Sequence, residues 1–171
     1  SYSMMDSILL RAWEMVNSFK TVASDEAKVN VRTVFIDDYL NHLHRILQPS
    51  VRKAGHRLEL DLEATGELRT APGYLAQIVT NLVNNAASHA FAEGTKGDIL
   101  ISSRRISMTE ITVSVSDNGK GIAEDVRSRI FIQYFTTAAD SGGTGIGLAI
   151  SAHLAETFLN GSLEHIPGEE C

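Results

Sequence analysis

The spacing of apolar residues along the chain predicts a protein that mixes helices and strands. Over Met4 to Ala23, apolar side chains recur every three or four residues, which indicates an amphipathic helix. This helix is either an appendage to the main domain or its first core helix. Over His56 to Leu62, leucines alternate with charged residues, which indicates a strand with one buried face.

Similar patterns, together with the positions of proline and glycine, predict the remaining elements. Further strands are expected at about 29–35, 98–106 and 110–116, and helices at about 37–47, 72–91, 124–131 and 144–159. We expect Pro49 to stop the helix that begins near Asp37, and Gly161 to open one last strand. Because strands occur in adjacent pairs, the expected fold class is α+β, with helices over a mixed, mainly antiparallel sheet.

Composition and charge narrow the class of protein. A length of 171 residues with 43% hydrophobic residues suits one compact domain with a short extra element and excludes a disordered chain. No apolar run approaches the roughly 20 residues of a membrane span. The single cysteine, Cys171, excludes a disulfide framework and favours a reducing, cytoplasmic setting. A formal charge of −6 argues against a nucleic-acid partner.

One face of the predicted helix at 72–91 carries amide and hydroxyl side chains. At about 100° per residue, this face presents Gln77, Asn81, Asn84, Asn85 and Ser88. Asparagine is a mediocre helix former, so this clustering suggests a binding role. An amide oxygen is a hard, neutral ligand that suits Mg²⁺. A merely solvated polar face is the alternative, and the stripe by itself does not decide against it.

The first of two glycine-containing loops follows the strand predicted at 110–116. Asp117 is followed by Asn118, Gly119, Lys120 and Gly121. A carboxylate at a strand end can accept a hydrogen bond from an exocyclic amine such as that of adenine. The glycines would let the backbone approach a flat base. An ordinary tight turn at Asn118 and Gly119 explains the motif equally well.

The second loop runs from Gly142 to Gly147, with four glycines in six positions, and leads into a helix. Free N–H groups at a helix N-terminus can donate hydrogen bonds to phosphate, and the helix dipole also favours negative charge there. The loop is not a P-loop, because it lacks the Gly-Lys-Ser/Thr ending. A flexible hinge is the alternative. The aromatic segment Ile130 to Thr137 between the loops is expected to anchor a lid over a nucleotide, or to pack in the core, or both.

These motifs, in this order, resemble the ATP-binding domain shared by histidine kinases, type II topoisomerases, heat-shock chaperones and mismatch-repair ATPases. The resembling motifs are the N box at Asn81–Ala86, the first G box at Asp117–Gly121, the F box at Phe131–Thr137 and the second G box at Gly143–Leu148. The resemblance implies the two-layer α/β sandwich of the Bergerat fold. It also implies an ATP-binding domain at residues 29–171 that lacks its last strand, preceded by the end of a dimerisation helix at residues 1–24.

The resemblance also implies a role for each site residue. Asn85 is expected to bind Mg²⁺ with Asn81 in support, and Asp117 to hold the adenine amine of ATP. The other expected nucleotide contacts are Ser88, His89, Gly119, Lys120, Gly121, Ile122, Thr136, Thr137, Gly143, Thr144, Gly145, Ile146, Gly147 and Leu148. Ser88 and Ala138 stand where many relatives carry lysines, so Lys120 or an arginine is expected to compensate, with His89 as a further phosphate donor.

Among the members of this superfamily, the sensor histidine kinases resemble the chain best. Asn81 stands where the ATPases and the anti-sigma serine kinases carry a glutamate, and an amide cannot act as a general base near neutral pH. The implied function is transfer of the γ-phosphoryl group of Mg-ATP to a histidine on an upstream dimerisation domain. His44 superficially resembles such a phosphoacceptor, but the strand that follows it makes an ordinary surface histidine the better interpretation.

The implied partners are the protein's own dimerisation domain, a response regulator reached indirectly, and a second copy in a full-length homodimer. Neither nucleic acid nor direct membrane contact is expected for this segment. Two other functions stay open: a nucleotide-binding module that switches a partner without chemistry, and an anti-sigma-type serine kinase.

Overall fold

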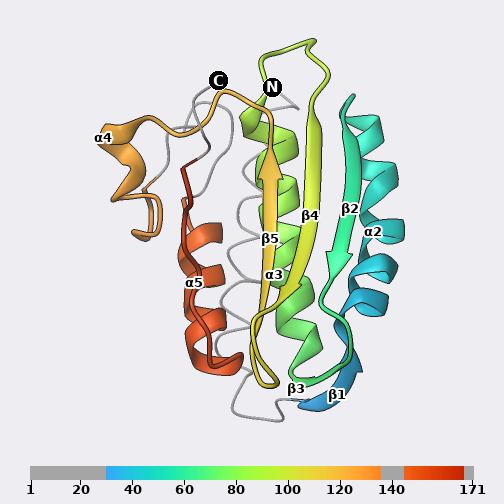
Figure 1. The fold of residues 1–171 in the computed structure, drawn as a ribbon. Coiled ribbons are helices and arrows are strands. Elements are labelled where there is room, and N and C mark those ends of the chain that lie inside the picture. Colours follow the sequence, from blue (N-terminus) through green and yellow to red (C-terminus); the bar gives the residue numbers. More distant parts are fainter. Residues whose placement is uncertain (1–29, 136–144, 168–171) are drawn as a thin grey trace, which may run out of the picture.

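The computed structural model describes residues 30–135 and 145–167, and the predictions for the opening helix and for residues 136–144 lie outside these ranges. Element labels follow Figure 1, with η2 added for a π-helical segment. The elements in chain order are β1 (Arg32–Phe35), α2 (Ile36–Lys53), β2 (Arg57–Glu63), β3 (Glu67–Thr70), α3 (Pro72–Asn85), η2 (Ala86–Ala90), β4 (Asp98–Arg105), β5 (Ile111–Asp117), α4 (Glu124–Arg127) and α5 (Gly147–Phe158).

The main sheet has the strand order β2-β4-β5, and β1 pairs with β3 as a separate antiparallel ribbon. β2 runs parallel to β4, with Leu58 opposite Ile99, whereas β4 and β5 are antiparallel. Helices α2 and α3 lie behind this sheet, and α5 lies beside α3 (Figure 1). The predicted α+β sandwich with a mixed sheet is therefore confirmed, and the described part of the main sheet has one parallel and one antiparallel strand pair.

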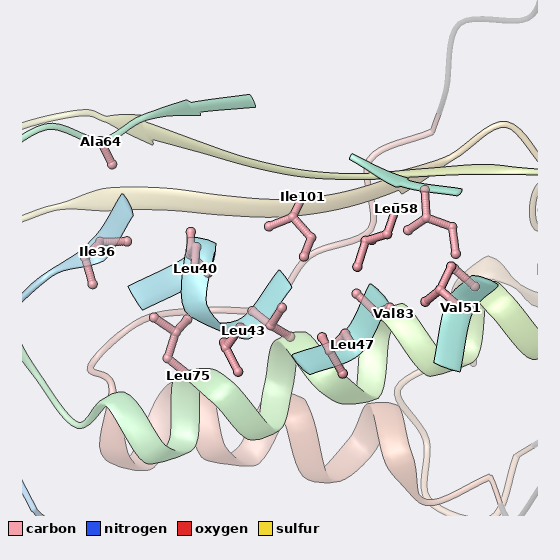
Figure 2. Close-up of a cluster of buried hydrophobic side chains, with 13 residues drawn as sticks. Ile36, Leu40, Leu43, Leu47, Val51, Leu58, Ala64, Leu75, Val83 and Ile101 are labelled. Atoms are coloured by element: carbon pink, nitrogen blue, oxygen red, sulfur yellow. The ribbon is translucent and has the colours of Figure 1, made fainter. Parts of the chain in front are cut away.

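The core lies between the sheet and these two helices, as Figure 2 shows. Its buried side chains come from α2, β2, α3 and β4, and include Ile36, Leu40, Leu43, Leu47, Val51, Leu58, Leu75, Val79, Val83, Ile99 and Ile101. In α2 these residues recur every three or four positions, as an amphipathic helix requires. A second, smaller cluster joins α3 to α5 around Ile78, Leu154 and Ala155. Helix α3 therefore packs on one side against the sheet and α2, and on another side against α5.

The prediction that Pro49 ends its helix is wrong, because α2 continues through Pro49 to Lys53. A proline inside a helix removes one hydrogen bond to the carbonyl four residues earlier, here that of Arg45. Arg45 and Pro49 are both exposed, so water can solvate that carbonyl. The additional turn buries Val51, which is 1% exposed. Burial of this side chain offsets the lost hydrogen bond.

Three further differences concern short elements. The strand β3 was not predicted, because its four residues pair only with β1, far away in the sequence. The helix predicted to run to Phe131 is limited to α4, which ends at Arg127. Gly161 does not open a strand, since residues 161–167 have no regular structure. These elements are short enough that pairing and packing, rather than periodicity, decide them.

The long helix predicted to end near Phe91 changes character inside the N box. The α-helix ends at Asn85, and a π-helical segment, η2, continues to Ala90. π-Helical segments are rare in proteins, and those that do occur are often found at functional sites. Phe91 then turns into extended backbone and its ring lies 4.4 Å from that of His56, centroid to centroid. The change from α-helix to π-helix therefore determines how the end of this helix contacts the first G box.

Candidate nucleotide-binding site

The first glycine loop lies directly against the end of η2. The backbone N–H of Lys120 donates to the carbonyl of Ala90 at 2.8 Å. A Cβ built on Gly119 would lie 2.3 Å from the same carbonyl oxygen, closer than any real contact. Only glycine therefore fits at position 119 with this backbone. The π-helical segment that follows the N box is therefore in contact with the first G box, although Ala90 and Gly119 are about thirty residues apart in the sequence.

Side chains within this loop hold its shape. The N–H of Gly119 donates to Oδ1 of Asp117 at 2.9 Å, which leaves the other carboxylate oxygen of this exposed residue for a ligand. Asn118 donates from Nδ2 to Oδ2 of Asp98 at 3.2 Å, and its Oδ1 accepts from the N–H of Asp98 at 2.8 Å. Asn118 thus ties the loop to the start of β4 and has a structural role.

An ion pair between Arg57 in β2 and Asp98 also holds the start of β4. Nε of Arg57 donates to Oδ1 of Asp98 at 2.8 Å. This hydrogen bond favours the ionised carboxylate, and so it lowers the pKa of Asp98. The loop that carries Asp117 is consequently joined through Asn118 and Asp98 to β2.

The second glycine loop reaches the N box through α5. Nδ2 of Asn81 donates to Oγ of Ser151 at 2.8 Å. A Cβ on Gly147 would lie 2.6 Å from Oδ1 of Asn81, so the carboxamide occupies the space that a side chain would need. Asn81 is therefore half-buried where α3 meets α5, and the alternative of a merely solvated polar face does not hold at this residue.

The F box and the second G box are joined by a backbone hydrogen bond. The N–H of Tyr134 donates to the carbonyl of Gly145 at 2.9 Å. Gly145 has a φ of +65°, and a Cβ on it would lie 2.6 Å from the carbonyl oxygen of Phe135. Both the backbone angle and the close approach require glycine. Arg129 covers the ring of Phe135 at 4.2 Å, which anchors this end of the F box.

A groove of about 330 Å³ lies between α3 and the start of α5. Its lining is mostly polar side chains and glycine, namely Ala76, Gln77, Thr80, Asn81, Asn84, Gly147, Ile150 and Ser151. Asn85 lies one turn after Asn81 on the same helix and is half-buried. Within the described part of the chain, no hydrogen bond engages its carboxamide, so its oxygen is available to a ligand.

The predicted site residues form three groups: exposed residues, half-buried residues and residues outside the described ranges. Ser88, Asp117, Lys120 and Gly121 are exposed. Those that are half-buried are Asn81, Asn85, His89, Gly119, Ile122, Gly145, Ile146, Gly147 and Leu148. Thr136, Thr137, Gly143 and Thr144 lie outside the described residues, so their predicted contacts stay predictions.

Sequence reasoning missed Ser151 and the backbone of Ala90. Ser151 follows Gly147 by one helical turn, so this spacing was the available signal that it shares a face with the glycine. Ala90 offered none, because it contributes a carbonyl rather than a side chain.

The donor set suits magnesium better than a metal held by protein alone. Residues 30–135 and 145–167 contain no group of three or more His, Cys, Asp or Glu residues that could hold a metal ion. Mg²⁺ usually takes one or two protein oxygens together with water and phosphate oxygens. The free carboxamide of Asn85 fits that pattern. Asn85 would hold the ion, which would neutralise charge on the phosphates.

Comparisons with known proteins agree with this assembly. Residues 70–170 match the family described as histidine kinase-, DNA gyrase B-, and HSP90-like ATPase. The sensor histidine kinase ZraS of Salmonella typhimurium is 32% identical over 131 residues, which cover 76% of this chain and 27% of ZraS. The sensor histidine kinase AruS of Pseudomonas aeruginosa is 36% identical over 120 residues, which cover 66% of this chain and 12% of AruS.

Solved structures of related proteins have the same fold. Full-length ShkA in complex with AMPPNP superposes with a TM-score of 0.69 and 27% identity, covering 84% of this chain and 30% of ShkA. The catalytic domain of the histidine kinase ThkA superposes with a TM-score of 0.63 and 26% identity, covering 74% of this chain and 80% of that domain. The chain thus belongs to the histidine kinase-, DNA gyrase B- and HSP90-like ATPase family, and its similarity to the ATP-binding catalytic domain of sensor histidine kinases is confirmed.

Proposed function

We propose that this chain binds Mg-ATP and donates the γ-phosphoryl group to a histidine on a dimerisation domain upstream of it. The chain spans 27% of ZraS and 12% of AruS, so the acceptor histidine is expected in another part of the full protein. In this proposal the full-length protein is a two-component signalling protein that forms a homodimer. A response regulator is the next phosphoryl acceptor.

One observation carries the proposal: the helix formed by α3 and η2 touches both glycine loops. Asn81 contacts Gly147 at the start of α5, and Ala90 contacts Gly119 in the loop after β5. These three motifs lie far apart in the sequence, and each is weak alone. Their convergence on one helix supports a single site with an adenine end at Asp117 and a phosphate end at Gly147.

Each end has a chemical task that suits its residues. At the adenine end, the carboxylate of Asp117 keeps one oxygen free to accept from the exocyclic amine. At the phosphate end, the first N–H groups of α5 have no partner inside the helix and attract anions. Asn85 would hold Mg²⁺ between these groups and the triphosphate. Such a site positions the γ-phosphoryl group and neutralises its charge, which is most of what phosphoryl transfer requires.

Hydrolysis of ATP by this chain is disfavoured by the state of Asn81. A water-activating residue needs a basic atom near neutral pH, and a carboxamide has none. The amide nitrogen of Asn81 is also engaged by Ser151 at 2.8 Å. The phosphoryl group is therefore expected to leave only when an imidazole from the dimerisation domain approaches.

The proposed setting is the cytoplasm, where ATP and response regulators are found. No helix within residues 30–135 and 145–167 is long and apolar enough to cross a membrane. The sequence similarity to sensor kinases leaves room for a sensing part elsewhere in the full protein.

Binding is tested by titrating Mg-ATP into the chain and three variants by calorimetry. Asp117→Asn should weaken binding about ten- to hundredfold, because it removes a hydrogen bond to a charged acceptor. Asn85→Ala should weaken binding in Mg²⁺ but not in EDTA. Asn41→Ala, an asparagine in α2 away from the site, is the matched control and should bind as the unsubstituted chain does. No heat with Mg-ATP would refute the site.

Transfer is tested in the full-length protein with labelled ATP. We expect acid-labile, base-stable label on histidine, lost in Asn85→Ala. Binding without transfer would instead show the nucleotide-binding module that acts without chemistry. Steady release of phosphate would show an ATPase.

A further inference from the structure

The contact between α3 and α5 contains one polar pair, a half-buried carboxamide and a buried hydroxyl, beside an apolar cluster. Ile78, Leu154 and Ala155 form the apolar part. Asn81 and Ser151 form the polar part, and Ser151 is only 2% exposed. A buried hydroxyl would be costly without its partner, so the pair specifies how the two helices meet.

The pair controls the position of the α5 N-terminus. With Nδ2 of Asn81 on Ser151, the carboxamide lies in the space next to Gly147, where a Cβ would be 3.2 Å from Cγ of Asn81. Gly147 is the first residue of α5. The unpaired N–H groups of the helix begin at this residue. Any shift of Asn81 away from Ser151 therefore frees the first turn of α5 to move.

The same pair also relates α5 to the proposed magnesium ligand. Asn85 follows Asn81 by four residues, so both project from one face of α3. A tie at Asn81 holds the N–H groups of α5 at a fixed separation from the carboxamide of Asn85. A phosphate chain bridged by Mg²⁺ must reach both groups at once, so its binding depends on that separation.

We propose that Ser151 is a positioning residue for the phosphate end of the nucleotide site: it holds the Asn81 carboxamide against Gly147 and so sets the start of α5 relative to Asn85. This inference rests on the proposed nucleotide site. Ser151 does not contact the loop at Asp117, which is tied to η2 and β4 instead. Loss of the Ser151 hydroxyl should therefore weaken the triphosphate interaction and spare the adenosine interaction.

The matched control is Ser103, which among the described residues is the other serine with a fully buried side chain. Ser103 is 0% exposed and donates to Oδ1 of Asp37 at 2.6 Å. Its hydroxyl joins the start of α2 to β4, away from both glycine loops. Ser103→Ala thus removes the same chemical group at an equally buried place. It should lower the melting temperature without changing the preference for ATP over AMP.

The experiment compares Mg-ATP affinity by calorimetry and AMP affinity by NMR titration in the whole chain. Ser151→Ala should weaken Mg-ATP about fivefold to tenfold, the usual effect of one hydrogen bond, and leave AMP unchanged. Asn81→Ala should do the same, and the double variant should be no weaker than the worse single variant, because both substitutions break one tie.

Several results would overturn the inference. Equal losses for Mg-ATP and AMP in Ser151→Ala, or an ATP-to-AMP ratio that also falls in Ser103→Ala, would reduce Ser151 to a packing role. Additive losses in the double variant would show that Asn81 and Ser151 act separately. If the unsubstituted chain bound AMP but not Mg-ATP, the proposed function itself would fail, and this result is visible before any variant is made.

Discussion

Replacing Gly119 by alanine tests whether the first glycine loop is held against η2. The added Cβ would lie 2.3 Å from the carbonyl oxygen of Ala90, 2.7 Å from its Cβ and 2.8 Å from its carbonyl carbon. Two of these atoms belong to the backbone, so no side-chain rotation can relieve the overlap. The loop must move away from Ala90, and its hydrogen bond from Lys120 lengthens or breaks.

The expected cost follows from these two effects. Overpacking by one methyl group in a tight contact costs about 1–3 kcal/mol, and the lost hydrogen bond adds about 1 kcal/mol. We therefore expect Gly119→Ala to lower the free energy of unfolding by roughly 2–4 kcal/mol. In a chain of this size, that is a fall of roughly 4–16 °C in melting temperature. Affinity for Mg-ATP should fall as well, because the displaced loop carries Asp117.

The matched control is Gly73→Ala in the first turn of α3. A Cβ at Gly73 meets nothing within 4 Å, and alanine favours a helix over glycine by up to about 1 kcal/mol. This variant should melt at the same temperature or higher and bind Mg-ATP unchanged. Urea unfolding and calorimetry of both variants provide the measurements. A Gly119→Ala variant that matches the control in both would refute the close contact with Ala90.

Three further predictions use the same measurements. Gly147→Ala pushes a Cβ to 2.6 Å from Oδ1 of Asn81, so Mg-ATP affinity should fall; adding Asn81→Ala should recover part of the lost stability, and no recovery would contradict the overlap. Asp98→Asn removes a carboxylate whose pKa is lowered by the hydrogen bond from Arg57, so the destabilisation should be full above about pH 4 and should shrink as pH falls below the folded pKa. A pH-independent melting difference would rule this out. Pro49→Ala restores a helical hydrogen bond in α2 and should stabilise the chain by about 1–3 kcal/mol in urea unfolding, whereas a loss of stability would show that the proline is needed.

Periodicity predicted the elements whose burial repeats regularly. The alternation at β2 was predicted correctly, because one face of that strand must be apolar. The start of α3 was predicted correctly from Pro72, because proline suits the first turn of a helix. The extension of α2 past Pro49 was not predictable in this way. It depends on whether water reaches the carbonyl of Arg45, which is decided by the tertiary fold.

The candidate site was predictable as a set of motifs but not as a set of contacts. The glycines were identified as places where a base or phosphate approaches the backbone. The structure shows that Gly119 is also required by the protein itself, since the backbone of Ala90 occupies the space beside it, and that the Asn81 side chain occupies the space beside Gly147. Such contacts join residues far apart in the sequence, and no local pattern encodes them. The hydrogen bond between Asn81 and Ser151 was missed for the same reason, although helical spacing places Ser151 on the same face of α5 as Gly147.

The π-helical segment η2 has a consequence for how the chain can vary. Each of its hydrogen bonds spans one residue more than in an α-helix, so its geometry depends on the number of residues between Asn85 and Phe91. Deleting one of the residues before Ala90 would turn its carbonyl about 100° around the helix axis, away from Gly119, and deleting Ala90 would remove that carbonyl. Substitution at an exposed position should leave this geometry intact, yet none of the five residues should tolerate removal.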